Sequence, residues 1–380
     1  MRFHVPDRKI DVSLSWRHTE IMRGVSIVLI MLHNLFHLYP TVCHECEFTY
    51  SPGLTKLFFE KMQNPDGYIF YHIISFLGWF GVPVFIFLSG YGLTRRYDSV
   101  ESGSQSNRNT FDKWSFIRRN WIKLFQLMLL GVGIFLLDQI INDLLSGGGI
   151  RWKNVAGILI PLTELNDTVQ LWLATIPGVY WYFGLAFEFY IFYALCVHGR
   201  RQLWMWIFAV VCFGAFLLLR KYPPISAEPL GFEEYMRHNF IGWMLPFACG
   251  VWLGRLRRMN LWVAISIVIA SILLFIPLQG SVYTWQLSAV CAIIIIMAIA
   301  LLFVRIPYWG DLWGWIGRLS AYLFVAHPIV RHLSRFLTFA NPYRHPVLPS
   351  LDQTFLYITL AFLGALLYRY INRFLFFSKR

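Results

Sequence analysis

Long apolar runs alternate with short polar segments along the whole chain. The hydrocarbon core of a bilayer is roughly 30 Å thick and takes about 20 helical residues to cross. Ten runs of about that length occur, at 20–39, 70–93, 118–141, 176–197, 202–219, 238–254, 260–277, 283–304, 315–333 and 352–375. The pattern predicts an all-α fold, a polytopic membrane bundle of about ten transmembrane helices in a single domain over 1–380. A shorter apolar stretch, 155–162, is predicted to be re-entrant or interfacial.

The composition supports a membrane protein and argues against a soluble one. Hydrophobic residues make up 57% of the 380 residues and charged residues only 14%, whereas a soluble domain averages roughly 25% charged residues. Disorder is excluded because it requires low hydrophobicity. The net charge is +13, but Lys and Arg stand in short clusters between apolar runs, which is typical of membrane topology. The lipid bilayer is therefore an expected partner, and nucleic acid is not.

The distribution of basic residues predicts the orientation of the chain. If both termini are cytoplasmic, the cytoplasmic segments are 1–23, 94–123, 198–201, 255–259, 305–318 and 369–380, and they hold 23 of the 33 Lys and Arg residues. Positive charge accumulates on cytoplasmic loops, and an even number of spans agrees with both termini on one side. The N-terminal segment is polar, so we expect the first apolar run to be retained as a helix.

The first predicted span carries Arg23 near its cytoplasmic end and His33, Asn34 and His37 near its outer end. His33 and His37 are four residues apart and share a helix face. One such histidine alone is more often a packing residue, and Arg23 alone would extend to the interface. Together they indicate a wet cavity, because charged groups at membrane depth are costly. An imidazole in that cavity is suited to accept and return a proton near neutral pH.

Three further spans contain polar residues at membrane depth. The second combines Pro83 and Ser89 with glycines, which is typical of close helix packing or of an unwound segment. The fourth carries Glu188, which we expect to pair with a base or to accept hydrogen bonds, as a structural group or at a site. The ninth carries His327 directly before Pro328, as a kink residue or a functional group.

Basic residues cluster at the predicted cytoplasmic ends of the second and third spans. The candidate phosphate-binding residues are Arg95, Arg96, Arg118, Arg119 and Lys123. Arg binds phosphate through paired donors, so the cluster fits a nucleotide-bearing donor such as a coenzyme A thioester. Anionic lipid headgroups fit the same charges, and charge alone leaves both interpretations open.

Two cysteines lie just outside the first span, in the run Cys43-His44-Glu45-Cys46. A CxxC run forms a disulfide or binds metal in some proteins. No second pair of ligands is visible in the sequence, so we expect no metal and assign the run to the shape of the outer side. The other cysteines lie inside apolar runs, where a free thiol behaves as a small hydrophobe.

Taken together, these segments resemble the acyltransferase-3 family, integral membrane acyltransferases that modify bacterial surface polysaccharides and other glycans. The matching segments occur in the family's order from residue 20 to about residue 330. They are Arg23-Gly24 with His33, Phe85 to Gly90, Phe116 to Arg119, Tyr180 to Tyr182 with Glu188 to Tyr190, and Ile316 to Tyr322 with His327-Pro328.

The resemblance implies a fold, a reaction and a set of site residues. The fold is a ten-helix bundle with a tunnel from a cytoplasmic donor site to an outer acceptor site. The reaction moves an acyl group, most often acetyl, from acyl-CoA to a hydroxyl of an extracytoplasmic glycan or glycolipid. Arg23 and His33 would be the catalytic pair, and the other expected site residues are His37, Ser89, Tyr182, Glu188, Ser320 and His327. We expect Ser89 to donate to the developing oxyanion, and Glu188 and His327 to orient the base or the acceptor.

The spacing of the catalytic pair departs from the family pattern. The family's Arg and His usually enclose ten residues, whereas residues 24–32 make nine. One residue rotates His33 by about 100° around an ideal helix. Either a local bulge restores the face, or His37 shares or takes over the role. The sequence also leaves open whether transfer is direct or passes through an acyl-enzyme.

Two other classes of protein remain as alternatives. A transporter or flippase would be indicated by inverted repeats with broken helices at matching positions, and we see no matching halves in the sequence. A non-catalytic scaffold would tolerate neutral replacements of Arg23, His33 and Glu188. An enzyme of the family it resembles is expected in the bacterial cytoplasmic membrane, as a multi-pass protein.

Overall fold

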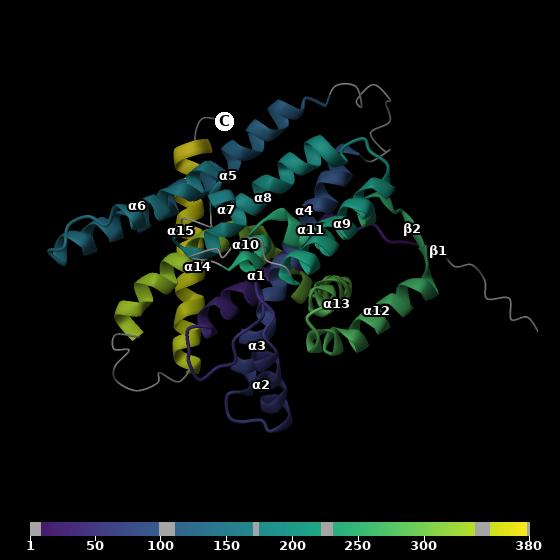
Figure 1. Cartoon of the computed structure of the whole chain (residues 1–380), viewed down its shortest axis with the longest axis horizontal. Helices are drawn as coiled ribbons and strands as arrows, with labels where there is room; N and C mark the ends of the chain where they lie inside the picture. Colours follow the sequence, from purple (N-terminus) through teal and green to yellow (C-terminus); the bar gives the residue numbers. More distant parts are fainter. Residues whose placement is uncertain (1–8, 99–110, 170–174, 222–230, 339–349, 378–380) are drawn as a thin grey trace, which may run out of the picture.

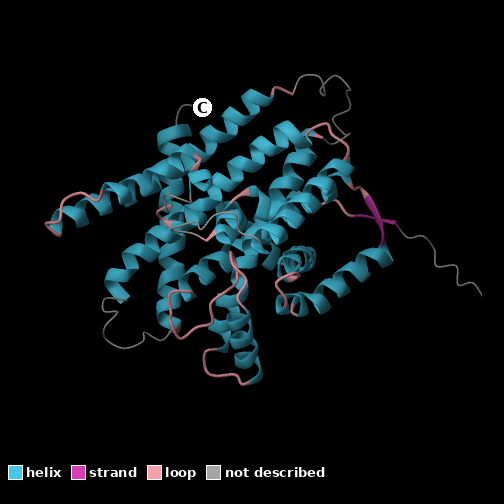
Figure 2. Ribbon diagram, in the orientation of Figure 1, coloured by secondary structure: helices cyan, strands magenta, loops and turns pink. Residues whose placement is uncertain are grey.

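The computed structural model describes residues 9–98, 111–169, 175–221, 231–338 and 350–377. Helices make up most of this part of the chain (Figure 2). Two short strands, β1 (Lys9–Asp11) and β2 (Arg258–Asn260), pair antiparallel and tie the N-terminal segment to the start of α12.

The longer helices follow the apolar runs. They are α1 (Trp16–Phe36), α2 (Pro52–Gln63), α3 (Ile69–Leu77), α4 (Gly81–Tyr97), α5 (Lys113–Leu145), α6 (Trp152–Leu159), α8 (Trp181–Phe192), α9 (Gln202–Lys221), α11 (Phe240–Arg255), α12 (Leu261–Phe275), α13 (Ser288–Phe303), α14 (Trp309–Thr338) and α15 (Leu351–Phe377). The shorter elements are α7 (Asn166–Val169), α10 (Phe232–His238), the π-helical turn η5 (Tyr193–Val197), and the 3₁₀ turns η1 (Gly78–Phe80), η3 (Ile160–Thr163), η4 (Gly178–Tyr180), η6 (Pro277–Gly280) and η7 (Trp285–Leu287).

Eight helical segments among the described residues are long and apolar enough to cross a membrane. They are Trp16–Phe36, Ile69–Tyr97, Lys113–Leu145, Gly178–Val197, Gln202–Lys221, Leu261–Gly280, Trp285–Phe303 and Leu351–Phe376. The other two predicted spans are helical as well. The first, α11, has only 16 residues, and the second, α14, carries Asp311, Arg318 and Arg331. The predicted all-α polytopic bundle is confirmed, while its orientation and its single-domain organisation stay predictions.

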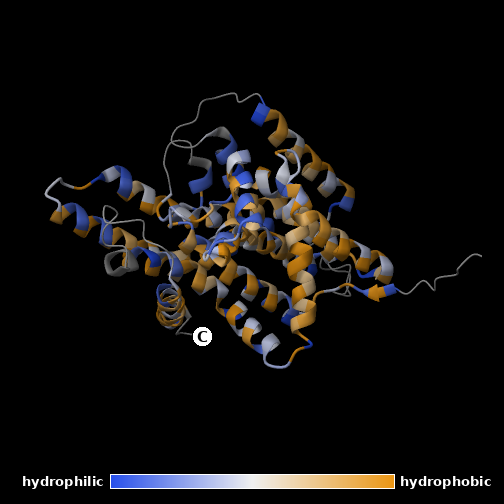
Figure 3. Ribbon diagram, turned by 90° about the horizontal axis from the view of Figure 1, so that it is seen from below, coloured by the Kyte–Doolittle hydropathy of each residue, from blue (hydrophilic) through white to orange (hydrophobic). Residues whose placement is uncertain are grey.

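The helices divide into central and peripheral ones. In the most apolar stretch of α1, and in that of the segment Ile69–Tyr97, 72% of the residues are buried, against 6% for the segment that contains α12. Figure 1 shows α12 at the edge of the bundle beside α13. Figure 3 shows long hydrophobic stretches along most helices, as expected for surfaces that face lipid.

Glycines bring the central helices into backbone contact. A Cβ on Gly250 of α11 would overlap the carbonyl oxygen of Phe87 on α4, and one on Gly90 would overlap that of Phe247. In the same way Gly24 of α1 and Gly317 of α14 lie against the partner backbone. Small residues are favoured at such interfaces because helices in a bilayer associate through close packing. These two crossings join α4 to α11 and α1 to α14.

The segment 152–163 returns along α5 after that helix ends. The Asn154 amide donates to Gln139 at 3.5 Å, whereas Thr163 accepts from the Trp121 indole at 3.3 Å. Gln139 and Trp121 are about 27 Å apart along α5 at 1.5 Å per residue. Figure 1 also shows α6 beside α5. The short apolar stretch therefore packs along α5 and does not form a helix of spanning length, and whether it is re-entrant or interfacial stays a prediction.

Candidate active site

A cavity of about 380 Å³ lies at the end of α1 that is predicted to face outside. We call it the outer cavity. Its lining residues are Ile30, His33, Asn34, His37, Leu38, Glu45, Glu47, Phe48, Val82, Thr175, Gly178, Val179, Trp181, Tyr182, Glu234, His238, Phe324 and Arg331. The polar stripe of the first span therefore faces this cavity rather than lipid. α1 is an uninterrupted α-helix from Trp16 to Phe36, so no bulge rotates His33, and His33 and His37 share the cavity with ring centroids 5.9 Å apart.

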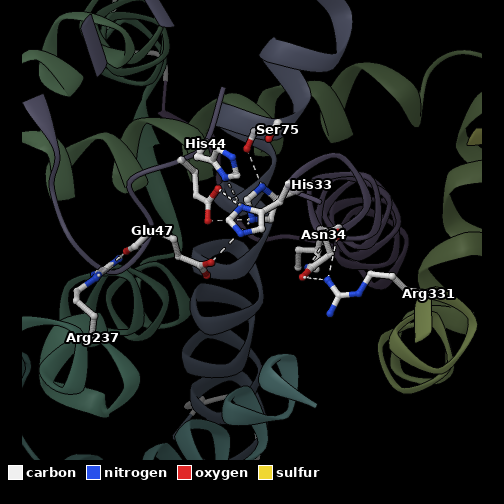
Figure 4. A network of polar contacts seen from close by, with 10 residues as sticks. His33, Asn34, His44, Glu47, Ser75, Arg237 and Arg331 are labelled. Atoms are coloured by element: carbon white, nitrogen blue, oxygen red, sulfur yellow. Dashed lines mark hydrogen bonds and ion pairs between the residues drawn. The ribbon is translucent and has the colours of Figure 1, made fainter. Parts of the chain in front are cut away.

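His33 is fixed on one side and open to the cavity on the other. Its Nδ1 donates to the backbone carbonyl of Ser75 at 2.7 Å, and the residue is 4% exposed. This bond assigns the proton to Nδ1 in the neutral ring, which leaves the lone pair on Nε2. Nε2 lies 3.8 Å from Glu45 Oε1 and 4.0 Å from Glu47 Oε2 (Figure 4). An imidazole held in this way can accept a proton at Nε2.

The two carboxyl groups beside His33 have different environments. Burial acts to raise the pKa of Glu45, but the neighbouring imidazoles of His33 and His37, the second through a hydrogen bond, lower that pKa to about 2. Burial, together with the charge of Glu45, raises the pKa of Glu47 well above its usual range, against the opposite effect of Arg237. Glu45 is therefore an ionised carboxylate near neutral pH, whereas Glu47 favours its protonated form.

The loop between α1 and α2 carries these acidic residues and is anchored from two helices. The buried guanidinium of Arg237 donates to the Glu47 carbonyl through Nε at 3.1 Å and Nη2 at 2.9 Å. The Arg237 guanidinium also stacks on Trp243, 3.8 Å from the ring centroid. On the other side of the acidic pair, the backbone N–H of Cys43 donates to His72 Nδ1 at 3.1 Å. These contacts explain how an irregular loop holds Glu45 and Glu47 against the end of α1.

A cation completes the outer cavity. Arg331 of α14 donates through Nη1 to the backbone carbonyl of Asn34 at 2.9 Å and to its side-chain oxygen at 3.2 Å (Figure 4). The Asn34 amide in turn donates to the Ile30 carbonyl at 2.9 Å. The cavity thus combines a proton acceptor, a carboxylate and a guanidinium.

The structure does not bring Arg23 to His33. The two residues are ten positions apart on one straight helix, which is about 15 Å. The Arg23 guanidinium lies 5.7 Å from the Trp16 ring centroid, and it is close enough to Tyr182 and Tyr190 to interact with them electrostatically. Arg23 therefore lies deeper in the bundle than the outer cavity.

The structure also shows the surroundings of four other predicted site residues, Ser89, Tyr182, Ser320 and His327. The Ser89 hydroxyl donates to the Phe85 carbonyl at 2.9 Å and also lies within hydrogen-bonding reach of Tyr182, which lines the outer cavity. Ser89 would have to release the Phe85 bond to donate to an oxyanion. Ser320 is buried on α14. His327 is fully buried, and its Nδ1 donates to the Leu323 carbonyl at 3.0 Å.

Glu188 accepts a hydrogen bond from the backbone N–H of Phe240 at 2.8 Å. Phe240 begins α11, where the Asn239 side chain accepts from the Ile241 N–H. A carboxylate is favoured at a helix N-terminus because the first N–H groups have no partner in the helix and carry partial positive charge. Glu188 thus accepts a hydrogen bond from a polar partner, as the sequence analysis expected, but the partner is a backbone N–H and not an Arg side chain; a functional role of Glu188 stays a prediction.

A second cavity, of about 660 Å³, lies at the other end of α4. We call it the inner cavity. It is lined by Arg95, Asp98, Phe111, Lys113, His198, Gly199, Arg200, Arg201, Gln202, Gly254, Arg255 and Arg257. Its cations come from three loops predicted to be cytoplasmic, and Asp98 pairs with Arg255 at 2.6 Å. The cavity is therefore strongly positive.

Only one of the predicted phosphate-binding residues lines the inner cavity. Arg95 does so, whereas Arg96, Arg118, Arg119 and Lys123 are exposed beside it on α4 and α5. Lys123 lies close enough to Arg96 and Arg119 to interact with them electrostatically. Lys113 belongs to the basic cluster after the second predicted span, and the lining cations that the sequence analysis did not single out are Arg200, Arg201, Arg255 and Arg257.

In the outer cavity the sequence analysis missed Glu47, Arg331 and the role of Glu45. The run Cys43-His44-Glu45-Cys46 drew attention to its cysteines, but both thiols are free. They pack in a small cluster with Phe58 and Phe76. The signal that could have identified the acids is the combination of His44, Glu45 and Glu47 within a few residues of the polar end of α1.

The fold and these cavities define an integral membrane protein with a polar, histidine-lined cavity inside its helical bundle. The model of the acyltransferase-3 family, described as an acyltransferase domain, matches residues 19–370, so the chain belongs to this family and is a membrane acyltransferase. The family membership favours the predicted enzyme over a transporter or a scaffold. No curated protein and no solved structure matches the chain.

Proposed function

We propose that this enzyme moves an acyl group, acetyl in the first instance, from cytoplasmic acyl-CoA to a hydroxyl of an extracytoplasmic glycan or glycolipid. The observation that carries the proposal is the arrangement of His33, whose Nδ1 is held by the Ser75 carbonyl while Nε2 faces the outer cavity beside Glu45. The chemistry of such a transfer needs a base at the acceptor hydroxyl, and this imidazole provides one. The expected location is the bacterial cytoplasmic membrane.

The proposed reaction begins with the acceptor hydroxyl bound in the outer cavity. His33 Nε2 takes the hydroxyl proton as the oxygen attacks the thioester carbonyl carbon. The tetrahedral intermediate then breaks its carbon–sulfur bond, and the coenzyme A sulfur leaves and takes the proton back from His33. The ester of the acceptor and free coenzyme A are the products. We propose direct transfer without an acyl-enzyme, because His33 supplies the base that direct attack of the acceptor hydroxyl requires.

Two neighbours of His33 support this role by their charge. The Glu45 carboxylate, 3.8 Å from Nε2, favours the imidazolium that forms during the reaction. Arg331 lines the same cavity and carries the opposite charge, which favours the oxyanion of the tetrahedral intermediate. Arg331 therefore fits the oxyanion role better than Ser89, whose proton is used by Phe85.

The inner cavity suits the nucleotide end of the donor. Phosphates are favoured among Arg95, Lys113, Arg200, Arg201 and Arg257, because several cations at close range offer charge and paired donors. The exposed Arg96, Arg118, Arg119 and Lys123 would attract the donor to this face.

The two cavities lie at opposite ends of α4. Val82 lines the outer cavity and Arg95 the inner one, which separates them by about 20 Å along the helix. The thioester arm would follow α4 past Ser89 and the tyrosines near Arg23. Arg23, Tyr182 and Ser89 would then position the arm, a role that differs from acid–base catalysis at His33.

Replacing the base tests the proposal. In membranes that contain the acceptor, His33→Ala is expected to reduce transfer of label from acetyl-CoA to the glycan fraction by about 10²–10⁴-fold. His18→Gln is the matched control on the same helix. His18 serves in the capping box at the start of α1, and Gln can fill that position, so activity should be kept.

The outcomes separate the possible functions. Normal amounts of inserted His33→Ala protein with full activity would remove the assignment of the base. Movement of the glycan across the membrane without any acylation would favour a flippase. Loss of acyl groups from surface glycans upon deletion of the gene would identify the acceptor class.

A further inference from the structure

Three metal-ligating side chains converge on the rim of the outer cavity. They are His37 at the end of α1 and the neighbouring pair His44 and Glu45 in the loop that follows. His37 Nδ1 lies 2.7 Å from Glu45 Oε2 and 3.3 Å from His44 Nδ1. The three ligand atoms all lie within 4.8 Å of one another. The imidazole rings of His37 and His44 meet edge to face, with centroids 4.7 Å apart.

The two hydrogen bonds of this arrangement meet at one atom, His37 Nδ1, which has a single proton to share between Glu45 and His44. If His37 Nδ1 carries a proton, it donates to the carboxylate of Glu45 and has no lone pair left for His44. If both Nδ1 atoms carry protons, two N–H groups face each other at 3.3 Å. A cation placed among the three groups would instead accept the lone pair of each imidazole and that of the carboxylate.

We propose that His37 Nδ1, His44 Nδ1 and Glu45 Oε2 bind a divalent transition metal, with Zn²⁺ as the ion of first choice. Zn²⁺ binds imidazole nitrogen and carboxylate oxygen at roughly 2.0–2.2 Å, so tetrahedral ligand atoms are separated by roughly 3.3 Å. The 3.3 Å spacing of the two imidazole nitrogens matches this value, and the 2.7 Å between His37 Nδ1 and Glu45 Oε2 would lengthen when the ion replaces the shared proton. Two histidines and one carboxylate leave a coordination position open, and His37 and Glu45 both line the cavity.

The surrounding contacts hold the ligands in place from both sides. Cys43, which precedes His44, donates its backbone N–H to His72, and His72 Nε2 lies 3.2 Å from Asp66. Glu47, which follows the ligand pair, accepts two hydrogen bonds from the buried Arg237. Supporting contacts of this kind orient metal ligands and raise affinity.

Glu45 would use one carboxylate oxygen to bind the metal and the other to face His33. Its Oε2 faces His37, while its Oε1 faces His33 Nε2 at 3.8 Å. A metal on Oε2 would therefore fix the carboxylate in the orientation that presents Oε1 to His33. The proposal rests on the arrangement of the three ligands and stands independently of the acyl transfer proposed above.

The site differs from the metal site that a CxxC run would suggest. Cys46 Sγ donates to the Ser51 carbonyl at 3.6 Å, and both cysteines pack against phenylalanines. We expected no metal from the sequence, because we looked for a second pair of ligands along the chain. The partner ligand is instead His37, which α1 presents from seven residues upstream.

Zn²⁺ binding to the full-length protein in detergent tests the proposal. After treatment with a chelator and desalting, titration calorimetry with ZnCl₂ should find one high-affinity site per chain. His37→Ala and His44→Ala should each weaken binding by roughly tenfold or more, since each removes one ligand. Substitution with Co²⁺ should give visible d–d bands without a thiolate charge-transfer band.

Controls and second variants keep the test decisive. Cys46→Ser and His18→Gln should bind Zn²⁺ like the wild type. If an alanine variant is poorly folded in a thermal melt, His37→Gln and His44→Gln replace it. Three results would each overturn the proposal: no site that binds one equivalent of Zn²⁺, wild-type affinity in both histidine variants, or a thiolate charge-transfer band with Co²⁺. None of these readouts depends on acyl transfer, so the two proposals can fail separately.

Discussion

The outer and inner cavities lie at opposite ends of α4, but they are built in different ways. In the outer cavity several polar groups have a defined hydrogen-bond partner: His33 with Ser75, Arg331 with Asn34, and Glu45 with His37. The inner cavity instead collects cations from three loops around one acid, Asp98. The first arrangement fixes individual atoms, as acid–base chemistry requires, whereas the second provides a diffuse positive potential, as binding of a charged group requires.

This difference predicts different responses to substitution. A single substitution in the outer cavity should lower kcat, because the polar atoms that act in the reaction are no longer held in position. A single change in the inner cavity should have a small effect on KM, because neighbouring cations compensate. Catalysis and donor binding should be lost together only when the crossing of α4 and α11 is disrupted.

The largest effect is expected from Gly250→Leu. The new side chain would overlap the Phe87 carbonyl and force α11 away from α4, and overpacking of this kind costs several kcal/mol when backbone must move. The amount of folded protein after detergent extraction, measured by size-exclusion chromatography, should fall steeply. Gly133→Leu on α5 is the control, because a Cβ there meets open space. Equal yields of the two variants would show that the crossing tolerates separation.

The next largest effect is expected from Arg331→Gln. Loss of a charge aimed at the oxyanion should reduce kcat by about 10²–10³-fold, with KM for acyl-CoA nearly unchanged. Initial rates over a range of acyl-CoA concentrations give the two parameters, and Arg331→Lys should restore part of the rate. Zn²⁺ binding should be kept, because Arg331 is not among the proposed ligands. A change in KM alone would assign Arg331 to binding instead.

The smallest effect is expected from Arg200→Gln combined with Arg201→Gln. Exposed charges contribute up to about 1 kcal/mol each, so KM for acyl-CoA should rise by about 3–10-fold while kcat stays the same. The increase should shrink at high salt, because exposed charges are screened. The double variant Arg305→Gln, Arg369→Gln is the control, since neither residue lines the inner cavity. A fall in kcat without a change in KM would contradict a binding role.

The fold could be predicted from the sequence to a large extent, and the site only in part. The ten apolar runs all became helices, because the cost of unpaired backbone groups in lipid leaves few alternatives. The polar end of α1 was found because His33, Asn34 and His37 are close in sequence. Arg23 and His33 were named as the catalytic pair on the family pattern; the straight helix places them about 15 Å apart, as their spacing in the sequence predicts, and their joint role stays a prediction. Glu188 was recognised as a buried acid, although its partner, the N-terminus of α11, lies 52 residues away in the chain.

The sequence by itself determined a helical membrane protein, the position of its polar stripe and the family to which it belongs. The fold class, the polar stripe and the family depend on local spacing or on composition, and both can be read from the sequence without knowing the tertiary structure. The tertiary structure alone decided that Glu45, Glu47 and Arg331 surround His33, and that cations from three loops form one cavity. Such contacts depend on how α1, α4, α11 and α14 cross and on how Arg237 holds the loop, and residues far apart in the chain meet only through that packing.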